Sequence, residues 1–171
     1  MEQDLSKRRA LVIRLTDHVL QHGLTGAGLR PMARAAGTSD RMLIYYFKTK
    51  DSLMAALLEE VGARIQRHLE TDRPAGKVGR DQLLDEIWAQ SQREPIARYL
   101  LLMVDLAIQA RGSQGPYAAG AQRMAEHFCD WIATRLDIED EAERSRTAFD
   151  LMATLDGLLL LKTFGLERPP G

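Results

Sequence analysis

Residues 40–47 combine side chains that can read a base pair with side chains that can bind a sugar-phosphate backbone. Arg41 lies in the first turn of a predicted short helix, where a guanidinium group can make a bidentate contact to guanine. Met42 offers an apolar surface to the methyl group of thymine. Tyr45 and Tyr46 offer rings and hydroxyl groups to sugar and phosphate, although either ring can equally pack between helices. These residue types and their spacing point to contact with duplex DNA.

Charged residues on either side of this segment fit the same chemistry. Lys50 follows the predicted N-cap Thr49, so its charge adds to the positive end of a helix and can hold a phosphate. Arg8 and Arg9 can lie along a phosphate strand or enter a minor groove, or form a solvated helix face. Asp40 either accepts a hydrogen bond from a cytosine amino group or reinforces the N-terminus of its helix.

The elements that must position these residues are helices, because the apolar residues recur at helical spacing and strict alternation is missing. We therefore expect an all-α fold. Gly37 favours a positive-φ stop between two short helices, and Ser39 can cap the second, whose Leu43 and Phe47 form a core face. Glycine and proline mark a turn at 23–28 and a linker at 72–79. The predicted helices span residues 5–21, 29–36, 40–47, 50–71, 80–91, 95–111, 116–136 and 140–164.

The net charge of −1 over 171 residues conceals an asymmetry. Residues 1–50 carry nine Lys or Arg against four Asp or Glu, a net charge of +5, and residues 51–171 carry 14 against 20, a net charge of −6. A basic head on an acidic body indicates that only the head contacts a polyanion, although such a split can also arise by chance.

Several other classes of protein are disfavoured. The single cysteine, Cys129, excludes an internal disulfide and is expected to be an inert buried thiol rather than a redox sensor. The start of the sequence does not resemble a signal peptide and no apolar run reaches membrane-spanning length, so we expect a cytoplasmic protein with no membrane partner. No enzyme motif is present, and no cofactor or metal is expected; His18 and His22 lack further ligands at metal-binding spacing.

The pattern over residues 8–60 resembles the tetracycline-repressor-like (TetR-type) family of transcriptional regulators. The resemblance rests on Gly23, the run from Leu29 to Ser39, Leu43, Tyr45-Tyr46-Phe47 and Thr49-Lys50-Asp51-Ser52-Leu53. Two residues depart from the family pattern. Ile44 replaces a tyrosine that usually touches phosphate. Gly28 replaces a Ser or Thr that often caps the second helix and binds phosphate, so only the backbone amide of Gly28 can bind phosphate here. The candidate DNA-contacting residues are Arg8, Arg9, Gly28, Asp40, Arg41, Met42, Tyr45, Tyr46 and Lys50.

The resemblance implies a helix-turn-helix DNA-binding domain at 1–50 and an effector-binding and dimerisation domain at 51–171, joined by the helix at 50–71. The last two helices are apolar around much of their circumference, which indicates burial against a second copy of the chain. The candidate residues of this dimer interface are Trp131, Leu151, Leu155, Leu158 and Leu159. Aromatic and methionine side chains can line an adaptable effector pocket or form plain core. The candidates are Trp88, Tyr99, Met103, Leu106, Tyr117, Met124, Phe128 and Phe149. Asp105 can orient a polar ligand or lie at the surface.

The expected function is a sequence-specific transcriptional regulator, a homodimeric repressor released from a palindromic operator by a small-molecule effector. The alternative is a helical protein-interaction module that does not bind DNA.

Overall fold

The computed structural model describes residues 2–24, 27–71, 76–94, 96–111 and 115–167, and these ranges form eight helices. The helices are α1 (Glu2–His22), α2 (Leu29–Ala35), α3 (Asp40–Phe47), α4 (Lys50–Thr71), α5 (Arg80–Ser91), α6 (Ile96–Ala110), α7 (Pro116–Arg135) and α8 (Glu141–Thr163). Within the described ranges, extended pairing is limited to an isolated bridge between Val78 and Leu136. The all-α expectation is confirmed, whereas residues 25–26, 72–75 and Pro95 of the predicted turn, linker and helix start lie outside the described residues.

The helix ends follow the local chemistry of the sequence. Ser39 caps α3, because its hydroxyl oxygen accepts a hydrogen bond from the Met42 amide. Asp140 caps α8 in the same way, with the Glu143 amide as donor at 2.7 Å. Gly23 and Gly37 have φ values of +71° and +65°, a region that side-chain-bearing residues rarely adopt, so they redirect the chain after α1 and α2.

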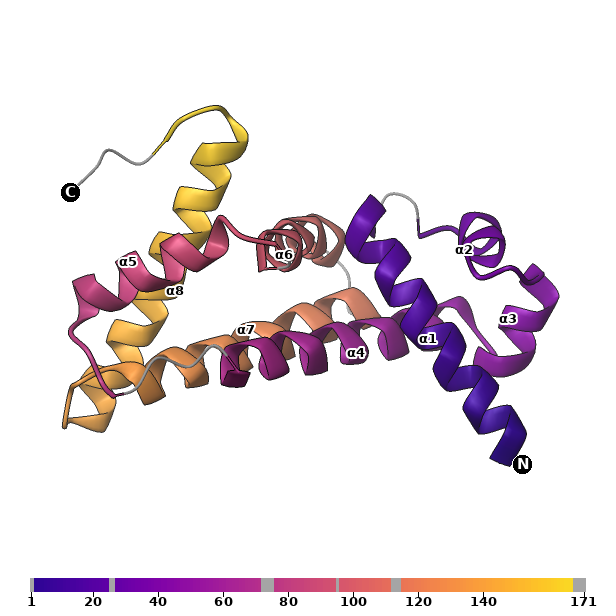
Figure 1. The fold of residues 1–171 in the computed structure, drawn as a ribbon, viewed down its shortest axis with the longest axis horizontal. Helices are drawn as coiled ribbons and strands as arrows, with labels where there is room; N and C mark the ends of the chain where they lie inside the picture. Colours follow the sequence, from indigo (N-terminus) through magenta and orange to yellow (C-terminus); the bar gives the residue numbers. More distant parts are fainter. Residues whose placement is uncertain (1, 25–26, 72–75, 95, 112–114, 168–171) are drawn as a thin grey trace.

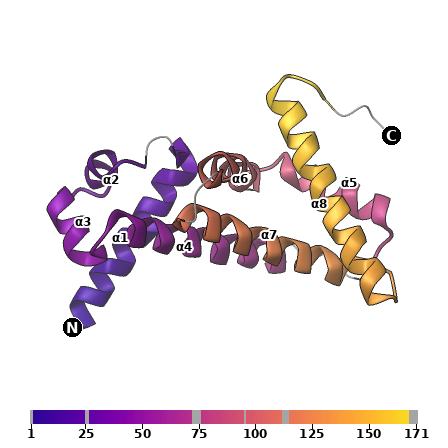
Figure 2. The ribbon, with the colours of Figure 1, turned by 180° about the vertical axis from the view of Figure 1, so that it is seen from behind.

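The eight helices build an elongated molecule (Figure 1). Helices α1, α2 and α3 form the head at one end, with α4 leading from the head into the body. Figure 2 shows from behind that α7 runs alongside α4 and that α8 crosses α7 at the far end. Helix α6 lies between α1 and the α5–α8 end, so it touches both halves of the molecule (Figure 1).

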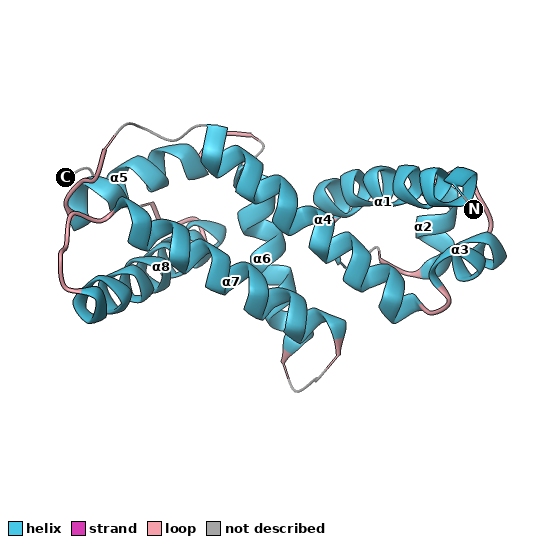
Figure 3. Ribbon diagram, turned by 90° about the horizontal axis from the view of Figure 1, so that it is seen from below, coloured by secondary structure: helices cyan, strands magenta, loops and turns pink. Residues whose placement is uncertain are grey.

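The hydrophobic core is divided between two clusters. The first joins the head to α4 and α6 and reaches Met124 of α7. The second packs α5 against the last turns of α7 and the inner face of α8. The first cluster contains residues on both sides of residue 50, so the core is continuous there, and a domain boundary at this residue is a proposal. Figure 3 shows α4 running from the head into the body.

Helices α4 and α7 approach each other closely at a glycine. A Cβ atom on Gly120 would lie 2.5 Å from Leu58 Cδ1 and 3.2 Å from Leu58 Cβ, both on the facing helix. A side chain at position 120 would therefore force the two helices apart. Gly120 of α7 therefore allows α7 to pack closely against α4, the helix that leads out of the head.

Candidate functional site

Helix α3 presents the predicted reading residues on its outer face. Leu43 and Phe47 are 0% and 2% exposed and belong to the head core. On the opposite face Met42 is 39% exposed and Tyr45 is 54% exposed, and Arg41 is also exposed. The division between the two faces is the one that the i, i+4 spacing predicts.

The turn before α3 is fixed by contacts from α1. Arg14 donates from Nη1 to the carbonyl oxygen of Ala36 at 2.7 Å, which satisfies an acceptor at the end of α2. Gly37 follows with its positive φ, and a Cβ atom there would lie 3.6 Å from the same guanidinium group. The long helix α1 therefore sets the angle at which the second short helix leaves the first.

The flanking candidates occupy different environments. Arg8 stacks its guanidinium group over the Phe47 ring at 5.0 Å, which holds the charge beside the end of α3. Arg9 and Lys50 are exposed. Gly28 is the N-cap of α2 and no side chain caps this helix, so its first amides are available to a phosphate.

Asp40 and the two tyrosines are partly engaged within the head. Asp40 lies 3.8 Å from Arg30 Nε in an exposed ion pair, and it stands in the first turn of α3, where a negative charge is favourable. Tyr46 is half-buried against the core and meets Tyr45 edge to face, with ring centroids 5.1 Å apart. Tyr45 thus has the more accessible ring of the two.

Three basic residues that were not among the predicted contacts also lie beside this surface: Arg30, Arg34 and Lys48. A hollow next to α3 is lined by Arg30, Arg34 and Thr38, with the Asp40 carboxylate at its edge. Lys48 has φ +68° and donates from Nζ to the carbonyl oxygen of Tyr45 at 3.0 Å. The i, i+4 spacing of Arg30 and Arg34 on α2 was the available signal for this pair.

A small apolar cavity of about 50 Å³ lies inside the body, where α4, α5, α6, α7 and α8 converge. Four of the eight predicted pocket residues line it: Tyr99, Met103, Met124 and Phe128. Its other walls include Ile65, Met152 and the polar side chains of Gln90 and Asp156. Burial raises the pKa of the Asp156 carboxyl above its ordinary value, although the residue as a whole is exposed.

The other four predicted pocket residues lie elsewhere. Leu106 is fully buried in the first core cluster, and Tyr117 packs against the same cluster. Trp88 lies under Lys162, whose Nζ is 6.0 Å from the indole centroid. Phe149 points outward and is 66% exposed.

The apolar residues of α8 divide between two faces. Leu151, Leu155 and Leu159 are buried in the chain's own second core cluster, with Leu158 and Trp131 packed against it. The opposite face exposes Phe149 and Leu160, and the C-cap residue Phe164 follows on the same side; they are 66%, 44% and 69% exposed. The interface candidates named from the sequence therefore face the protomer's own core, while other apolar side chains of the same helix face outward.

His18 and His22 stack on each other with ring centroids 4.4 Å apart, and His22 Nδ1 lies 2.9 Å from the carbonyl oxygen of His18. Burial and the charge of His22 lower the pKa of His18. Within the described ranges no three potential metal ligands gather in one place, and no helix is long and apolar enough to cross a membrane.

Cys129 is half-buried and its thiol donates to the sulfur of Met152 at 3.2 Å. Burial, with the nearby carboxylates of Asp130 and Asp156, raises the pKa of this thiol. A raised pKa lowers the thiolate fraction at pH 7, and the thiolate is the reactive form.

We therefore expect iodoacetamide to alkylate Cys129 several-fold more slowly than an unstructured cysteine peptide at pH 7. The rate should rise only at a higher pH than the peptide requires. Removal of a nearby negative charge in Asp156→Asn should increase the rate, because it lowers the thiol pKa. A rate at pH 7 equal to that of the peptide would contradict this expectation.

The fold and the exposed face of α3 define the class of the protein, a helix-turn-helix DNA-binding transcriptional regulator. Residues 19–57 match the sequence model for bacterial regulatory proteins of the tetR family. The match covers most of the head and the start of α4, and it confirms the resemblance seen in this part of the sequence.

Solved structures share this fold along almost the whole chain. A transcriptional regulator from Rhodococcus sp. Rha1 is 26% identical with a TM-score of 0.71, and the match covers 92% of this chain and 83% of that one. NemR of E. coli in its reduced form is 20% identical with a TM-score of 0.73, over 94% and 89% of the two chains. A protein from Saccharomonospora viridis, solved in complex with choline, is 17% identical with a TM-score of 0.63, over 92% and 85%. Among curated proteins, none matches the sequence.

Proposed function

We propose that this protein is a homodimeric repressor that binds a palindromic operator through α3 and is released when a small molecule occupies the cavity of the body. The observation that carries the proposal is the exposed face of α3, where Arg41, Met42 and Tyr45 stand on a helix fixed by its core residues. No catalytic step is part of the proposal.

Arg41 and Met42 are the base readers in this proposal, because both are exposed in the first turn of the helix that enters the major groove. Lys50, Arg8 and Arg9 bind the phosphate backbone, together with the amides that begin α2. Arg30 and Arg34, which line the hollow beside α3, extend this basic surface. Ile44 is 37% exposed and offers only an apolar contact where a tyrosine hydroxyl would reach a phosphate.

A palindromic operator requires two reading heads, and members of this family bind DNA as dimers. The outward face of α8, with Phe149, Leu160 and Phe164, is the apolar surface that we assign to the partner subunit. Leu151, Leu155 and Leu159 pack α8 against the core of its own protomer and so fix the position of this outward face.

The cavity supports the effector site. It is enclosed by five helices, its walls are mainly apolar, and Gln90 and Asp156 supply polar groups. A volume of about 50 Å³ is well below the several hundred Å³ of typical ligand sites, so an effector larger than a few heavy atoms must displace wall residues. One of those walls is Ile65 of α4, the helix that leads to the head. The protein of similar fold from S. viridis was solved in complex with choline, which supports a small-molecule effector for this chain.

The proposal is tested by selecting duplexes from a random-sequence pool with the purified protein. We expect a palindromic sequence that binds two chains per duplex and loses affinity steeply as salt rises. In Arg41→Ala, discrimination at the contacted base should fall by about 1–3 kcal/mol, because a bidentate contact is lost. In Lys50→Ala, affinity should fall for all sequences alike and the salt slope should decrease by about one.

Glu59→Ala serves as a control, since Glu59 is an exposed residue of α4 away from the head surface. Equal and sequence-independent losses in Arg41→Ala and Lys50→Ala would contradict the assigned roles. Failure to select any duplex would favour the alternative, a protein-interaction module whose basic head binds an acidic protein.

A further inference from the structure

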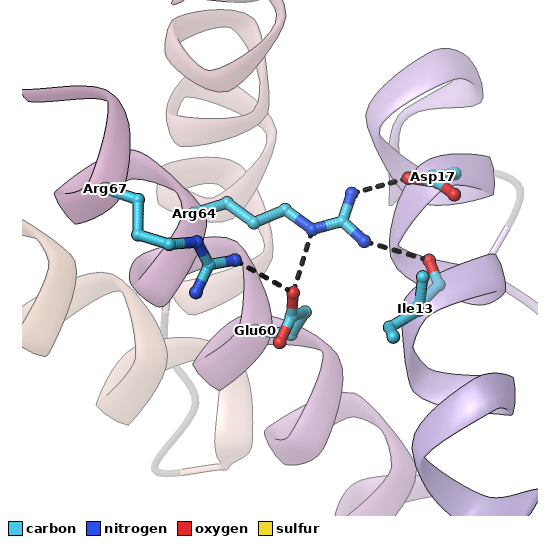
Figure 4. Close-up of polar contacts among 5 residues, drawn as sticks. All are labelled: Ile13, Asp17, Glu60, Arg64 and Arg67. Atoms are coloured by element: carbon cyan, nitrogen blue, oxygen red, sulfur yellow. Dashed lines mark hydrogen bonds and ion pairs between the residues drawn. The ribbon is translucent and has the colours of Figure 1, made fainter. Parts of the chain in front are cut away.

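Arg64 of α4 is the centre of a polar cluster that ties α4 to α1 (Figure 4). Its Nη1 atom is 2.5 Å from Asp17 Oδ1 and its Nη2 atom donates to the carbonyl oxygen of Ile13 at 3.2 Å, both on α1. Its Nε atom donates to Glu60 Oε1 at 2.9 Å, one turn earlier on α4. The guanidinium group therefore bridges the first helix of the head and the helix that enters the body.

This cluster is more than an exposed ion pair. The Arg64 side chain is 16% exposed, and Glu60, which also accepts from Arg67, is 25% exposed. Burial alone would lower the pKa of Arg64, but hydrogen bonds and charges from Asp17 and Glu60 raise it above its ordinary value. Charged hydrogen bonds in a partly buried site are stronger and more directional than surface pairs, so the cluster fixes α1 against α4.

Tyr99 of α6 connects this cluster to the cavity. Its ring lines the cavity, the residue is 4% exposed, and its hydroxyl group lies near enough to Arg64 to feel the charge of the guanidinium group. Burial raises the pKa of Tyr99, while the charges of Arg64 and Arg67 act in the opposite direction. On the same side His68 of α4 approaches the ring, with centroids 5.7 Å apart. A molecule in the cavity would therefore press on Tyr99, which packs on α4 at His68, and on Ile65, which directly follows Arg64.

Helix α6 also holds the head at a second point, fewer than two turns from Tyr99. Asp105 Oδ2 accepts a hydrogen bond from the backbone amide of Leu24 at 3.0 Å, just after α1. A Cβ atom on Gly23 would lie 2.5 Å from the same oxygen, so the contact requires glycine there. The two head contacts, through Arg64 and through Asp105, thus both depend on the position of α6.

We propose that Arg64 is the positioning residue through which the cavity controls the orientation of the reading head. In the empty protein Tyr99 supports Arg64, which holds Asp17 and Ile13 and so fixes α1 with its attached helix-turn-helix. An occupant that displaces Tyr99 releases this hold and lets α1 move against α4. This inference rests on the proposed function for its consequence at the operator, and on the contacts alone for the change in α1.

The experiment fills the cavity by mutation, which removes the need for an identified effector. Met103→Trp places an indole in the cavity next to Tyr99, and Leu100→Phe is a milder substitution of another wall residue. We expect either to weaken binding to the selected operator about 5- to 150-fold, the usual range of coupling between sites. The same variants should accelerate hydrogen exchange of the α1 amides around Ile13 and Asp17, measured without DNA.

The decisive comparison repeats the cavity substitution in Asp17→Ala, which breaks the Arg64 contact at an exposed residue of α1. In that background Met103→Trp should weaken operator affinity by a clearly smaller factor than in the wild type, because Arg64 keeps only its contact with the Ile13 carbonyl oxygen on α1. Asp4→Ala, at another exposed aspartate of α1, should preserve the full effect, and Ile108→Trp, on the exposed face of α6, should produce none.

An equal effect of Met103→Trp with and without Asp17, in both affinity and exchange, would overturn the proposal. If the wild-type protein selects no operator, the proposed function fails, and the exchange measurement still decides whether Arg64 links the cavity to α1.

Discussion

Phe47→Ala is expected to lower the free energy of unfolding by about 3–5 kcal/mol, the range for removing a buried aromatic side chain. Phe47 is 2% exposed in the head core and also carries the guanidinium group of Arg8 on its ring. The substitution leaves a cavity between α3 and the rest of the head core. Urea unfolding followed by circular dichroism measures the change.

Tyr45→Ala is the matched control, because it removes an aromatic side chain that is 54% exposed on the same helix. Its effect on unfolding should stay within about 0.5 kcal/mol, while operator binding weakens. A stability loss as large as that of Phe47→Ala would show that the inward and outward faces of α3 are assigned incorrectly.

Glu86→Gln is expected to destabilise the protein by about 2–4 kcal/mol, because it removes a carboxylate that pairs with the buried charge of Arg135 beside the second core cluster. The Arg135 side chain is 1% exposed, and its Nη2 atom lies 3.0 Å from Glu86 Oε2. The expected loss is below that of a fully buried pair, because Glu86 is 28% exposed and water can reach it. Thermal and urea unfolding both report the effect.

The double substitution Glu86→Leu with Arg135→Met should recover most of the stability, since apolar residues of similar volume replace the pair without a buried charge. Glu94→Gln provides the surface comparison. It removes a charge from an i, i+4 pair with Arg98 whose side chains are 60% and 44% exposed, and it should cost at most about 0.5 kcal/mol. If Glu86→Gln were as mild as Glu94→Gln, the burial of Arg135 would carry no electrostatic cost.

The helices could be predicted from the sequence because their signals are local. Ser39 and Asp140 cap the helices that follow them, and Gly37 supplies the turn before α3. The inner and outer residues of α3 follow from spacing within one helix. Local capping and periodicity therefore account for the helix order and for the exposed face of the head.

The cavity could be predicted only in part, because its walls depend on how five helices cross. Met152 and Phe149 lie one turn apart on α8 and are both apolar, yet one lines the cavity and the other is exposed. Composition does not distinguish such neighbours. The α8 leucines illustrate the same difficulty, since an all-round apolar helix does not reveal which face its own protomer covers.

Polar links between distant residues were beyond the reach of sequence reasoning. Arg64 and Asp17 are 47 positions apart, and Asp105 and Leu24 are 81 positions apart. Each residue is unremarkable in its own segment, and only the packing of α1 against α4 and α6 brings them together. Asp105, predicted either to orient a ligand or to lie at the surface, instead holds the end of the first helix.

Helix α4 supplies Leu53 and Leu57 to the head core and Ile65 to the cavity wall. Mutations along this helix are therefore pleiotropic, since a change selected for a new effector also alters the part that reads DNA. The cavity residues Phe128 of α7 and Met152 of α8 line the cavity but do not pack in the head core. Under the proposed function, genetic divergence toward new effectors is expected to proceed through these two helices while α4 stays constrained.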